Sequence, residues 1–238
     1  MRLIGFSTGA LARDDFRRAL QILARTNVHA VELSALRQYE LIPLIEALDR
    51  PDLREFKYKA FHAPSSMDRD FESTAISLLD QVALRQWPIV VHPDAMHSPS
   101  KWAHFGDLLC IENMDKRKPI GQTPADLADI FKELPRASLC FDIGHARQVD
   151  PTMSEATEIL HRYKARLRQL HISEVNSRSK HDALSFESVL AFRRVAHLIP
   201  ESVPVIVESR VGEDEVAEEI LNARKALSFE SVLAIAGD

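Results

Sequence analysis

Short apolar runs alternate along this chain with longer segments in which apolar residues recur every three to four positions. Apolar runs of about four to six residues, bounded by turn residues, predict buried strands, whereas the longer periodic segments predict helices. We expect strands at residues 3–6, 29–33, 58–62, 89–92, 108–112, 138–142, 167–171 and 203–208. We expect helices from residue 14 onward and at 39–48, 74–86, 123–134, 151–164 and 185–198.

The order of these elements predicts an α/β fold. Strict alternation of strands and helices implies a parallel sheet covered by helices, and eight strands favour closure into a (β/α)8 TIM barrel over an open sheet. Residues 1–238 are close to the ~250 residues typical of one such domain. Residues 97–105 leave room for only a shortened fourth helix. The segment ALSFESVLA occurs at 183–191 and again at 226–234, and we expect the second copy to supply an extra C-terminal helix.

Acidic and imidazole side chains stand at the ends of the predicted strands. They are Glu32, His62, His92, Glu112, Asp142, His171 and Glu208. In a parallel barrel these ends meet at one mouth, and charged groups gathered there are costly unless they are paired or bind an ion. His145 follows Asp142 closely, and Gly144 between them permits a tight turn back to the mouth. The mixture of ligand types suits Zn, Mn, Co or Fe.

The residues two positions before each strand end are expected to face the barrel interior one layer deeper. These residues are small or apolar with one exception, Gln169, which we place beneath His171 as a supporting group. The intervening residues, such as Phe141 and Val207, are apolar and are expected to face the helices.

Composition narrows the classes of partner. The formal net charge of −5 argues against a surface built for nucleic acid or anionic lipid. No apolar run approaches the ~20 residues that cross a bilayer, and no secretory leader is recognisable, so we expect a cytoplasmic protein without a membrane partner. Cys110 and Cys140 are too few for a disulfide framework and are expected to be buried thiols. The oligomeric state stays open.

The loops after the strands are rich in basic residues: Lys116, Arg117, Lys118, Arg147, Arg178, Lys180 and Arg210. Acidic residues are interspersed among them, so the loops form either an ordinary solvated surface or a rim that binds an anionic group of a small-molecule substrate. For the second case we expect substrate contacts from Lys118, Arg178 and Arg210.

Six short motifs appear in order along the chain: FHAPS (61–65), VHPD (91–94), IENMD (111–115), FDIGHA (141–146), HISEV (171–175) and VES (207–209). As a set they resemble the xylose isomerase-like TIM-barrel superfamily, which contains sugar and sugar-phosphate isomerases and epimerases and zinc-dependent apurinic-site endonucleases. The resemblance to the epimerases implies that Glu112, Asp142, His171 and Glu208 hold a divalent ion. It also implies that the two glutamates are the catalytic acid and base.

The endonuclease branch of the superfamily carries further histidines, and the resemblance implies that His62, His92, His145 and His181 are metal ligands too. The chain departs from that branch at Ser179, where an Asp would stand two residues before His181. It departs from the epimerases at Ser177, where they often have an Arg; here Arg178 is one residue later.

Three functions are open at this point. The leading hypothesis is an isomerase or epimerase of a small sugar or sugar-phosphate-like hydroxy-carbonyl compound, in which Glu112 and Glu208 move the proton while His145 and Glu32 contact the substrate. The second is a hydrolase or lyase in which Glu112 bridges clustered ions, the apurinic-site endonucleases being the nucleic-acid case. The third is a non-catalytic binding barrel. One bound ion per chain would favour the first hypothesis, and two or three would favour the second.

Overall fold

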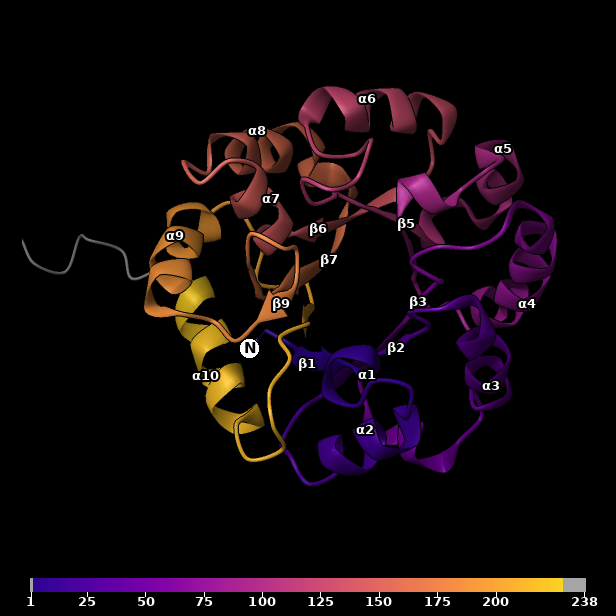
Figure 1. Cartoon of the computed structure of the whole chain (residues 1–238), viewed down its shortest axis with the longest axis horizontal. Coiled ribbons are helices and arrows are strands. Elements are labelled where there is room, and N and C mark those ends of the chain that lie inside the picture. The colour runs from indigo at the N-terminus through magenta and orange to yellow at the C-terminus, as the bar shows by residue number, and fades with distance from the viewer. Residues whose placement is uncertain (1, 229–238) are drawn as a thin grey trace, which may run out of the picture.

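A closed barrel of parallel strands forms the centre of the molecule (Figure 1). The computed structural model describes residues 2–228. The barrel strands are β1 (Ile4–Ser7), β2 (Ala30–Ser34), β3 (Tyr58–His62), β4 (Ile89–Val91), β5 (Leu109–Glu112), β6 (Ser138–Asp142), β7 (Leu167–Ile172) and β10 (Val205–Val207). They pair in the order β1-β10-β7-β6-β5-β4-β3-β2, so the first and last strands close the ring. The predicted (β/α)8 TIM barrel is confirmed.

Most helices surround the barrel on its outside, whereas α1 (Thr8–Leu11) and α7 (Ile143–Val149) lie closer to the barrel and contribute residues to its mouth (Figure 1). The other helices are α2 (Phe16–Leu23), α3 (Leu41–Glu46), α4 (Glu72–Leu84), α5 (Pro99–Trp102), α6 (Pro124–Glu133), α8 (Ser154–Tyr163), α9 (Phe186–Ala196) and α10 (Val216–Leu227). Short 3₁₀ helices lie at 38–40, 51–55, 69–71, 93–95, 103–108 and 164–166. None of the described helices combines the length and apolarity that crossing a membrane requires.

The fourth helix is shortened as predicted, because α5 has 4 residues and continues only as the 3₁₀ helix Ala103–Leu108. The second copy of ALSFESVLA begins inside α10, which contains Ala226 and Leu227. Residues 229–234 of that copy lie outside the described part of the chain, and with them most of the predicted extra C-terminal helix.

Helix starts follow the local sequence. At α6 the Thr123 hydroxyl accepts a hydrogen bond from the Asp126 N–H, the Asp126 carboxylate accepts one from the Thr123 N–H, and Pro124 is the first helical residue. At α2 the cap is Asp15, whose side chain accepts from the Arg18 N–H, and not Asp14, which has a positive φ of 67°.

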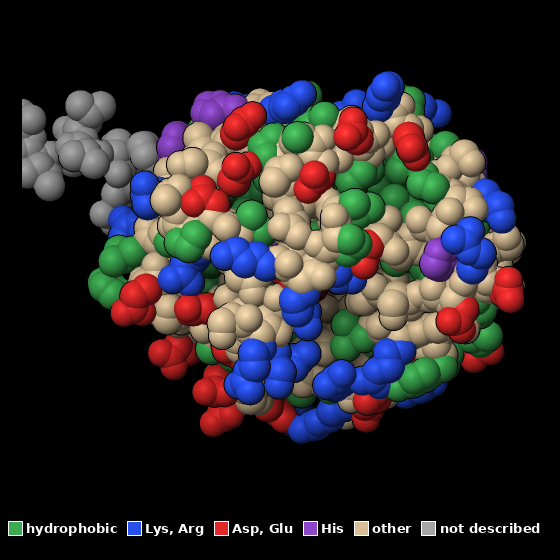
Figure 2. All heavy atoms as spheres, turned by 45° about the horizontal axis from the view of Figure 1, so that its top comes forward, with side chains coloured by type: hydrophobic (Ala, Val, Ile, Leu, Met, Phe, Trp, Pro, Cys, Tyr) green, Lys and Arg blue, Asp and Glu red, His purple; other side chains and the backbone are tan. Residues whose placement is uncertain are grey.

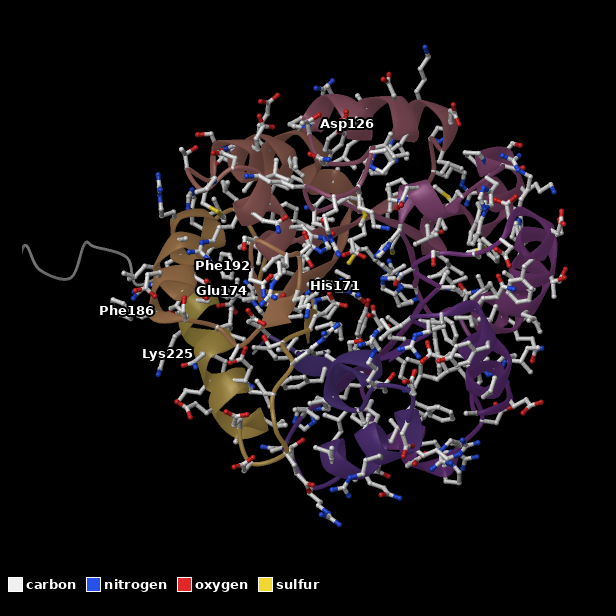
Figure 3. The ribbon with its side chains drawn as sticks, in the orientation of Figure 1. Asp126, His171, Glu174, Phe186, Phe192 and Lys225 are labelled. Atoms are coloured by element: carbon white, nitrogen blue, oxygen red, sulfur yellow. The ribbon has the colours of Figure 1, made fainter. Side chains whose placement is uncertain are left out.

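Apolar side chains lie on both sides of the barrel strands, facing the helices on the outside and the barrel interior on the inside, as the alternation of side chains predicts. Phe141 and Val207 point outward into the large core between sheet and helices, while Val90, Cys110 and Cys140 form a separate buried cluster inside the ring. His171 lies at the centre of the molecule, whereas Phe186 and Lys225 lie at its edge, on α9 and α10 (Figure 3).

Several elements were not predicted, among them the helices α1, α7 and most of α10, and a hairpin after β7. The strands β8 (Glu174–Val175) and β9 (His181–Asp182) pair antiparallel to form a small hairpin after β7. This hairpin carries His181 to the mouth of the barrel, where the side chain joins the ends of the barrel strands.

Candidate metal site at the barrel mouth

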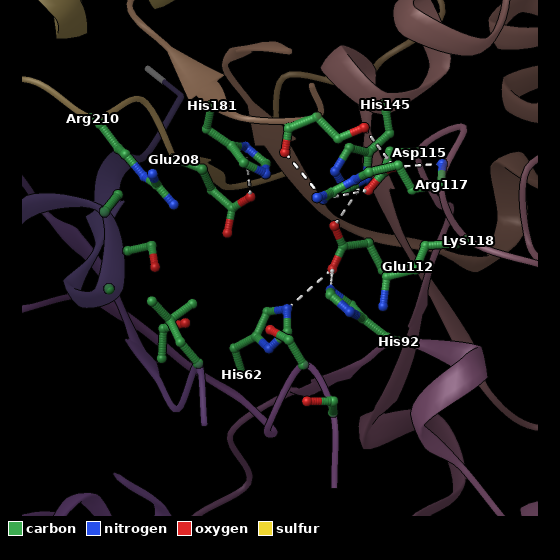
Figure 4. Close-up of a pocket in the computed structure, with 18 residues that line it drawn as sticks. His62, His92, Glu112, Asp115, Arg117, Lys118, His145, His181, Glu208 and Arg210 are labelled. Carbon is green, nitrogen blue, oxygen red and sulfur yellow. Dashed lines mark hydrogen bonds and ion pairs between the residues drawn. The ribbon is translucent and has the colours of Figure 1, made fainter. Parts of the chain in front are cut away.

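The carboxyl ends of the strands enclose a cavity of about 450 Å³ (Figure 4). Its wall includes most of the predicted ligands: His62, His92, Glu112, His145, His181 and Glu208. Three groups of possible metal ligands occur among the described residues. Within each group, every residue offers one ligand atom, and these atoms all lie within 4.8 Å of one another. The groups are His62–His92–Glu112, Glu112–Asp142–His171–Glu208 and Asp142–His145–His181.

The first group places two imidazoles on one carboxylate oxygen. His62 Nε2 and His92 Nε2 lie 3.1 and 3.2 Å from Glu112 Oε2. The His62 ring is fixed by its other nitrogen, because Nδ1 lies 2.6 Å from the Ala63 carbonyl oxygen and can donate to it. A neutral His62 therefore has its Nε2 lone pair available for an ion.

The second group contains buried polar atoms that have no hydrogen-bond partner among the described residues: Asp142 Oδ2 and His171 Nδ1. His171 Nδ1 lies 3.5 Å from Glu112 Oε1 and 3.6 Å from Glu208 Oε2. Leaving a buried polar atom unsatisfied costs about 1–3 kcal/mol, and a cation between these ligands would satisfy both atoms. The donor set therefore fits a divalent ion.

Glu112 belongs to both groups and directs one oxygen to each. Oε2 contacts His62 and His92, whereas Oε1 faces His171. A carboxylate shared in this way is suited to bridge two cations. Its pKa lies well below the ordinary value, because His92 and His171 outweigh the effect of burial, so Glu112 is ionised at neutral pH.

The third group is held in place by hydrogen bonds to Ser173, directly after β7, and to Asn113, directly after β5. His145 Nδ1 lies 2.9 Å from the Asn113 carbonyl oxygen, and His181 Nδ1 lies 2.8 Å from Ser173 Oγ. Ser179, which replaces the Asp of the endonuclease branch, donates its hydroxyl hydrogen to Asp115 Oδ1 over 2.7 Å.

The loop after β6 differs from the predicted tight turn. Helix α7 begins directly after Asp142, whose Oδ1 accepts a hydrogen bond of 2.7 Å from the His145 N–H. Asp142 is thereby both a helix cap and a ligand candidate. Gly144 is required by close packing, since a Cβ there would overlap the Ser173 carbonyl oxygen.

The ion-free cluster has strongly perturbed acidities. Burial, together with Glu112 and Asp142, raises the pKa of Glu208 to about 7 in spite of His171. Burial lowers the pKa of His62, but the hydrogen bond and charge of Glu112 outweigh it and raise the value to about 9. Burial and the nearby His145 lower the pKa of His181 to about 3. Such opposed shifts are typical of functional clusters.

Glu32 does not lie where we predicted. The register pairs Ser34 with His62 and Glu32 with Ala60, so Glu32 stands one layer below the mouth. It is 0% exposed and is not part of the cavity wall, so the structure does not place it in contact with a substrate. Gln169 lies beneath His171 as expected, with its Nε2 2.8 Å from His171 Nε2.

The basic side chains divide into two sets. Lys118 and Arg210 line the cavity as predicted, and Lys118 Nζ is 2.8 Å from Asp94 Oδ2. Arg178 is exposed on the turn of the hairpin and does not line the cavity; Arg117 does instead. Figure 2 shows Lys and Arg side chains gathered on one part of the displayed face, with acidic side chains around them.

The sequence interpretation also missed a set of small polar residues in the wall: Ser7, Ser34, Ser65 and Ser66. Ser7 and Ser34 are the last residues of β1 and β2, so the rule that strand ends form the mouth would have found them. Asn113 was missed as well. Its side chain exchanges two hydrogen bonds of 2.8 Å with the backbone of Asp142 and so fixes the end of β6 beside β5.

Comparisons with known proteins agree with this architecture. A family model described as a xylose isomerase-like TIM barrel matches residues 102–227. A solved protein of Anabaena variabilis ATCC 29413, named as a proposed sugar phosphate isomerase/epimerase, is 14% identical with a TM-score of 0.63, over 95% of this chain and 98% of that one. A xylose isomerase domain protein of Alicyclobacillus acidocaldarius is 14% identical with a TM-score of 0.59, over 94% and 98%.

A third solved structure, SacUVDE, is 15% identical with a TM-score of 0.57, over 95% of this chain and 99% of that one. At such identities the likeness establishes the fold alone. A search of curated proteins gave no match.

Proposed function

This chain belongs to the xylose isomerase-like TIM barrel family, and within it we propose a metal-dependent hydrolase that holds two divalent ions and cleaves a phosphate ester of a small substrate. The observation that carries the proposal is the position of Glu112. Its two oxygens face two different groups of ligands, which is the arrangement of a bridging carboxylate. A site with one ion would need only the second group and would leave His62 and His92 without a role at the cavity.

Two neighbouring divalent ions supply Lewis acidity and lower the pKa of water toward neutrality. The described ligands combine imidazole with carboxylate, a mixture that suits Zn, Mn, Co or Fe. We expect Lys118 and Arg210 to bind the oxygens of the phosphate, because both line the same cavity as the ligands. The ion pair with Asp94 orients the Lys118 side chain beside His92 (Figure 4).

The size of the cavity supports a small substrate. Its volume of about 450 Å³ lies at the lower end of the ~300–1,000 Å³ typical of small-molecule pockets. The serine hydroxyls of the wall, from Ser7, Ser65 and Ser66, offer hydrogen bonds to hydroxyl groups of a sugar-sized molecule.

A second candidate, sugar isomerase or epimerase, is favoured by one specific observation. Glu112 and Glu208 both lie beside His171 Nδ1, at 3.5 and 3.6 Å, so two carboxylates flank the place of one ion. Such a pair can remove and return a proton at a carbon next to a carbonyl group. This function needs one ion, so the number of bound ions distinguishes the two candidates.

The test begins with protein that has been stripped with a chelator, reloaded with Zn²⁺ or Mn²⁺ and freed of excess ion. We expect elemental analysis to find two or more ions per chain, and one fewer in the double variant His62→Ala/His92→Ala. The variant His104→Ala is the control, because His104 is exposed and pairs with Asp80 away from the cavity.

Activity is measured with p-nitrophenyl phosphate and bis(p-nitrophenyl) phosphate, and with ketoses in deuterated water. Phosphate-ester cleavage that is lost in the double variant supports the hydrolase. One ion per wild-type chain, an unchanged count in the double variant and deuterium incorporation into a ketose would replace it with the isomerase.

A further inference from the structure

We propose that Glu32 is a positioning residue for metal binding: its carboxylate holds the His171 ring from below, so that Nδ1 faces Glu112, Asp142 and Glu208. The inference rests on the metal binding of the proposed function and not on the reaction that is catalysed. It assigns a role to a carboxylate that the cavity does not reach.

The argument begins with the two nitrogens of His171. Nδ1 faces the ligands of the second group and has no hydrogen-bond partner among the described residues. A ring nitrogen that binds a cation cannot keep its hydrogen, so the hydrogen of a neutral, coordinating His171 must be on Nε2. Glu32 Oε2 lies 3.1 Å from Nε2 and is the acceptor for that hydrogen.

Gln169 and Tyr58 complete the support. The Tyr58 hydroxyl donates to Gln169 Oε1 over 2.6 Å, which fixes the orientation of the amide. The amide nitrogen then donates one hydrogen to Glu32 Oε2 over 2.6 Å and the other toward Cys140 Sγ at 3.7 Å. Its 2.8 Å contact with His171 Nε2 is therefore a contact between two nitrogens that both donate to Glu32 Oε2. Glu32 Oε2 therefore accepts from two donors, and the amide keeps the carboxylate directed at His171.

The position of Glu32 is costly without such a role. It is 0% exposed, its Oε1 has no hydrogen-bond partner in the described structure, and the neighbouring interior positions Val90, Cys110 and Cys140 are uncharged. A buried carboxylate is destabilising unless a cation or several donors compensate it. An ion held by His171 Nδ1 would place positive charge on the opposite side of the imidazole ring from Glu32. Metal binding by the second group would therefore reduce the free-energy cost of burying the Glu32 carboxylate.

Carboxylates that orient a metal-binding histidine in this way typically contribute about 10–100-fold to metal affinity. We therefore expect Glu32→Gln, which keeps the shape but removes the charge, to weaken ion binding by about that factor. The matched control is Glu72→Gln. Glu72 is also a buried carboxylate, 1% exposed, but it accepts hydrogen bonds from Trp102 Nε1 and the Ser98 N–H, away from the cavity.

The experiment titrates metal-free, full-length protein with Co²⁺ and follows the visible absorption of the bound ion, in the His62→Ala/His92→Ala background so that the second group is observed. A loss of about 10–100-fold for Glu32→Gln with an unchanged affinity for Glu72→Gln supports the positioning role. Equal affinities in the Glu32→Gln variant and its parent overturn that role and leave the metal site intact. If the wild-type chain binds no Co²⁺, the proposed function fails as well.

A second measurement does not depend on the folding of any variant. In Zn²⁺-loaded wild-type protein labelled with ¹⁵N-histidine, we expect the His171 Nε2 resonance to be that of a protonated, hydrogen-bonded nitrogen and Nδ1 to be that of a coordinated one. Coordination through Nε2, or an Nε2 without hydrogen, would overturn the assignment.

Discussion

Glu208 links the stability of the ion-free protein to pH in a direction that can be measured. Burial raises its pKa to about 7; the charge of His171 opposes this shift, and the charges of Glu112 and Asp142 add to it. In an unfolded chain the ordinary value of 4.5 applies. Folding therefore favours the protonated carboxyl, and this contribution to stability is complete below about pH 4.5 and is lost as the pH rises through 7.

The size of the effect follows from the shift. A difference of about 2.5 pKa units at about 1.4 kcal/mol per unit corresponds to about 3 kcal/mol. For a domain of this length, 1 kcal/mol changes the melting temperature by about 2–4 °C, so we expect a decrease of about 6–12 °C from Glu208 between pH 4.5 and 8. His62 adds to the decrease above about pH 6.5, because its pKa is raised to about 9, whereas His181, whose pKa is lowered to about 3, opposes the decrease below pH 6.5. The contribution of Glu208 is therefore obtained from the difference between the wild type and a variant at Glu208.

Thermal unfolding of chelator-treated protein, followed by circular dichroism from pH 5 to 8, separates the two contributions. Glu208→Gln keeps the size of the side chain but cannot ionise, so its melting temperature should decrease less steeply with pH than that of the wild type. Glu46→Gln, an exposed site at the end of α3, should follow the wild type. With saturating Zn²⁺ the wild-type trend should reverse, because ions bind deprotonated ligands. Parallel profiles for Glu208→Gln and wild type without ion would refute the reasoning.

Three further predictions concern the fold and the site. Removal of ions by a chelator should lower the melting temperature by about 5–11 °C for each bound ion, relative to protein at an ion concentration 100 times the dissociation constant. Glu112→Ala, which loses both groups, should show a much smaller difference. Lys118→Met should weaken the binding of inorganic phosphate to metal-loaded protein by about 10-fold or more in calorimetry, and an unchanged affinity would remove Lys118 from the anion site. Gly5→Ala should destabilise the barrel by more than about 4 kcal/mol in urea unfolding, because the added Cβ would overlap the Ala30 carbonyl oxygen of β2; wild-type stability would contradict the packing described here.

The strands and most ligands could be predicted because the end of each apolar run coincides in the sequence with a charged or imidazole residue. Each apolar run is short, and its final charged residue marks both the end of the strand and the position of a side chain at the mouth. His62, Glu112 and Asp142 are the last residues of β3, β5 and β6, as expected. The inward and outward alternation was also predictable, since it depends only on the period of a strand.

The depth of a side chain in the barrel could not be predicted in the same way. Depth depends on the stagger between neighbouring strands, which no single strand encodes. Glu32 illustrates this: β2 continues to Ser34, which pairs with His62, so Glu32 lies beside Ala60 one layer lower.

Loop side chains were the least predictable. Whether a basic residue reaches the cavity depends on contacts between loops that are distant in sequence. Arg117 donates hydrogen bonds to the Asp115 carboxylate and the Ser179 carbonyl oxygen, and it lines the cavity. Arg178, one residue before Ser179, lies instead on the exposed turn of the β8–β9 hairpin.

The order of the ligands along the chain has a consequence for biosynthesis. His62, His92 and Glu112 have all been translated by the end of β5, whereas the second group needs Glu208, directly after β10, the strand that closes the ring against β1. A chain still attached to the ribosome could therefore assemble the first trio of ligands early. It could assemble the second set only after the final barrel strand had emerged from the exit tunnel, so the two groups of ligands would be completed in sequence during synthesis.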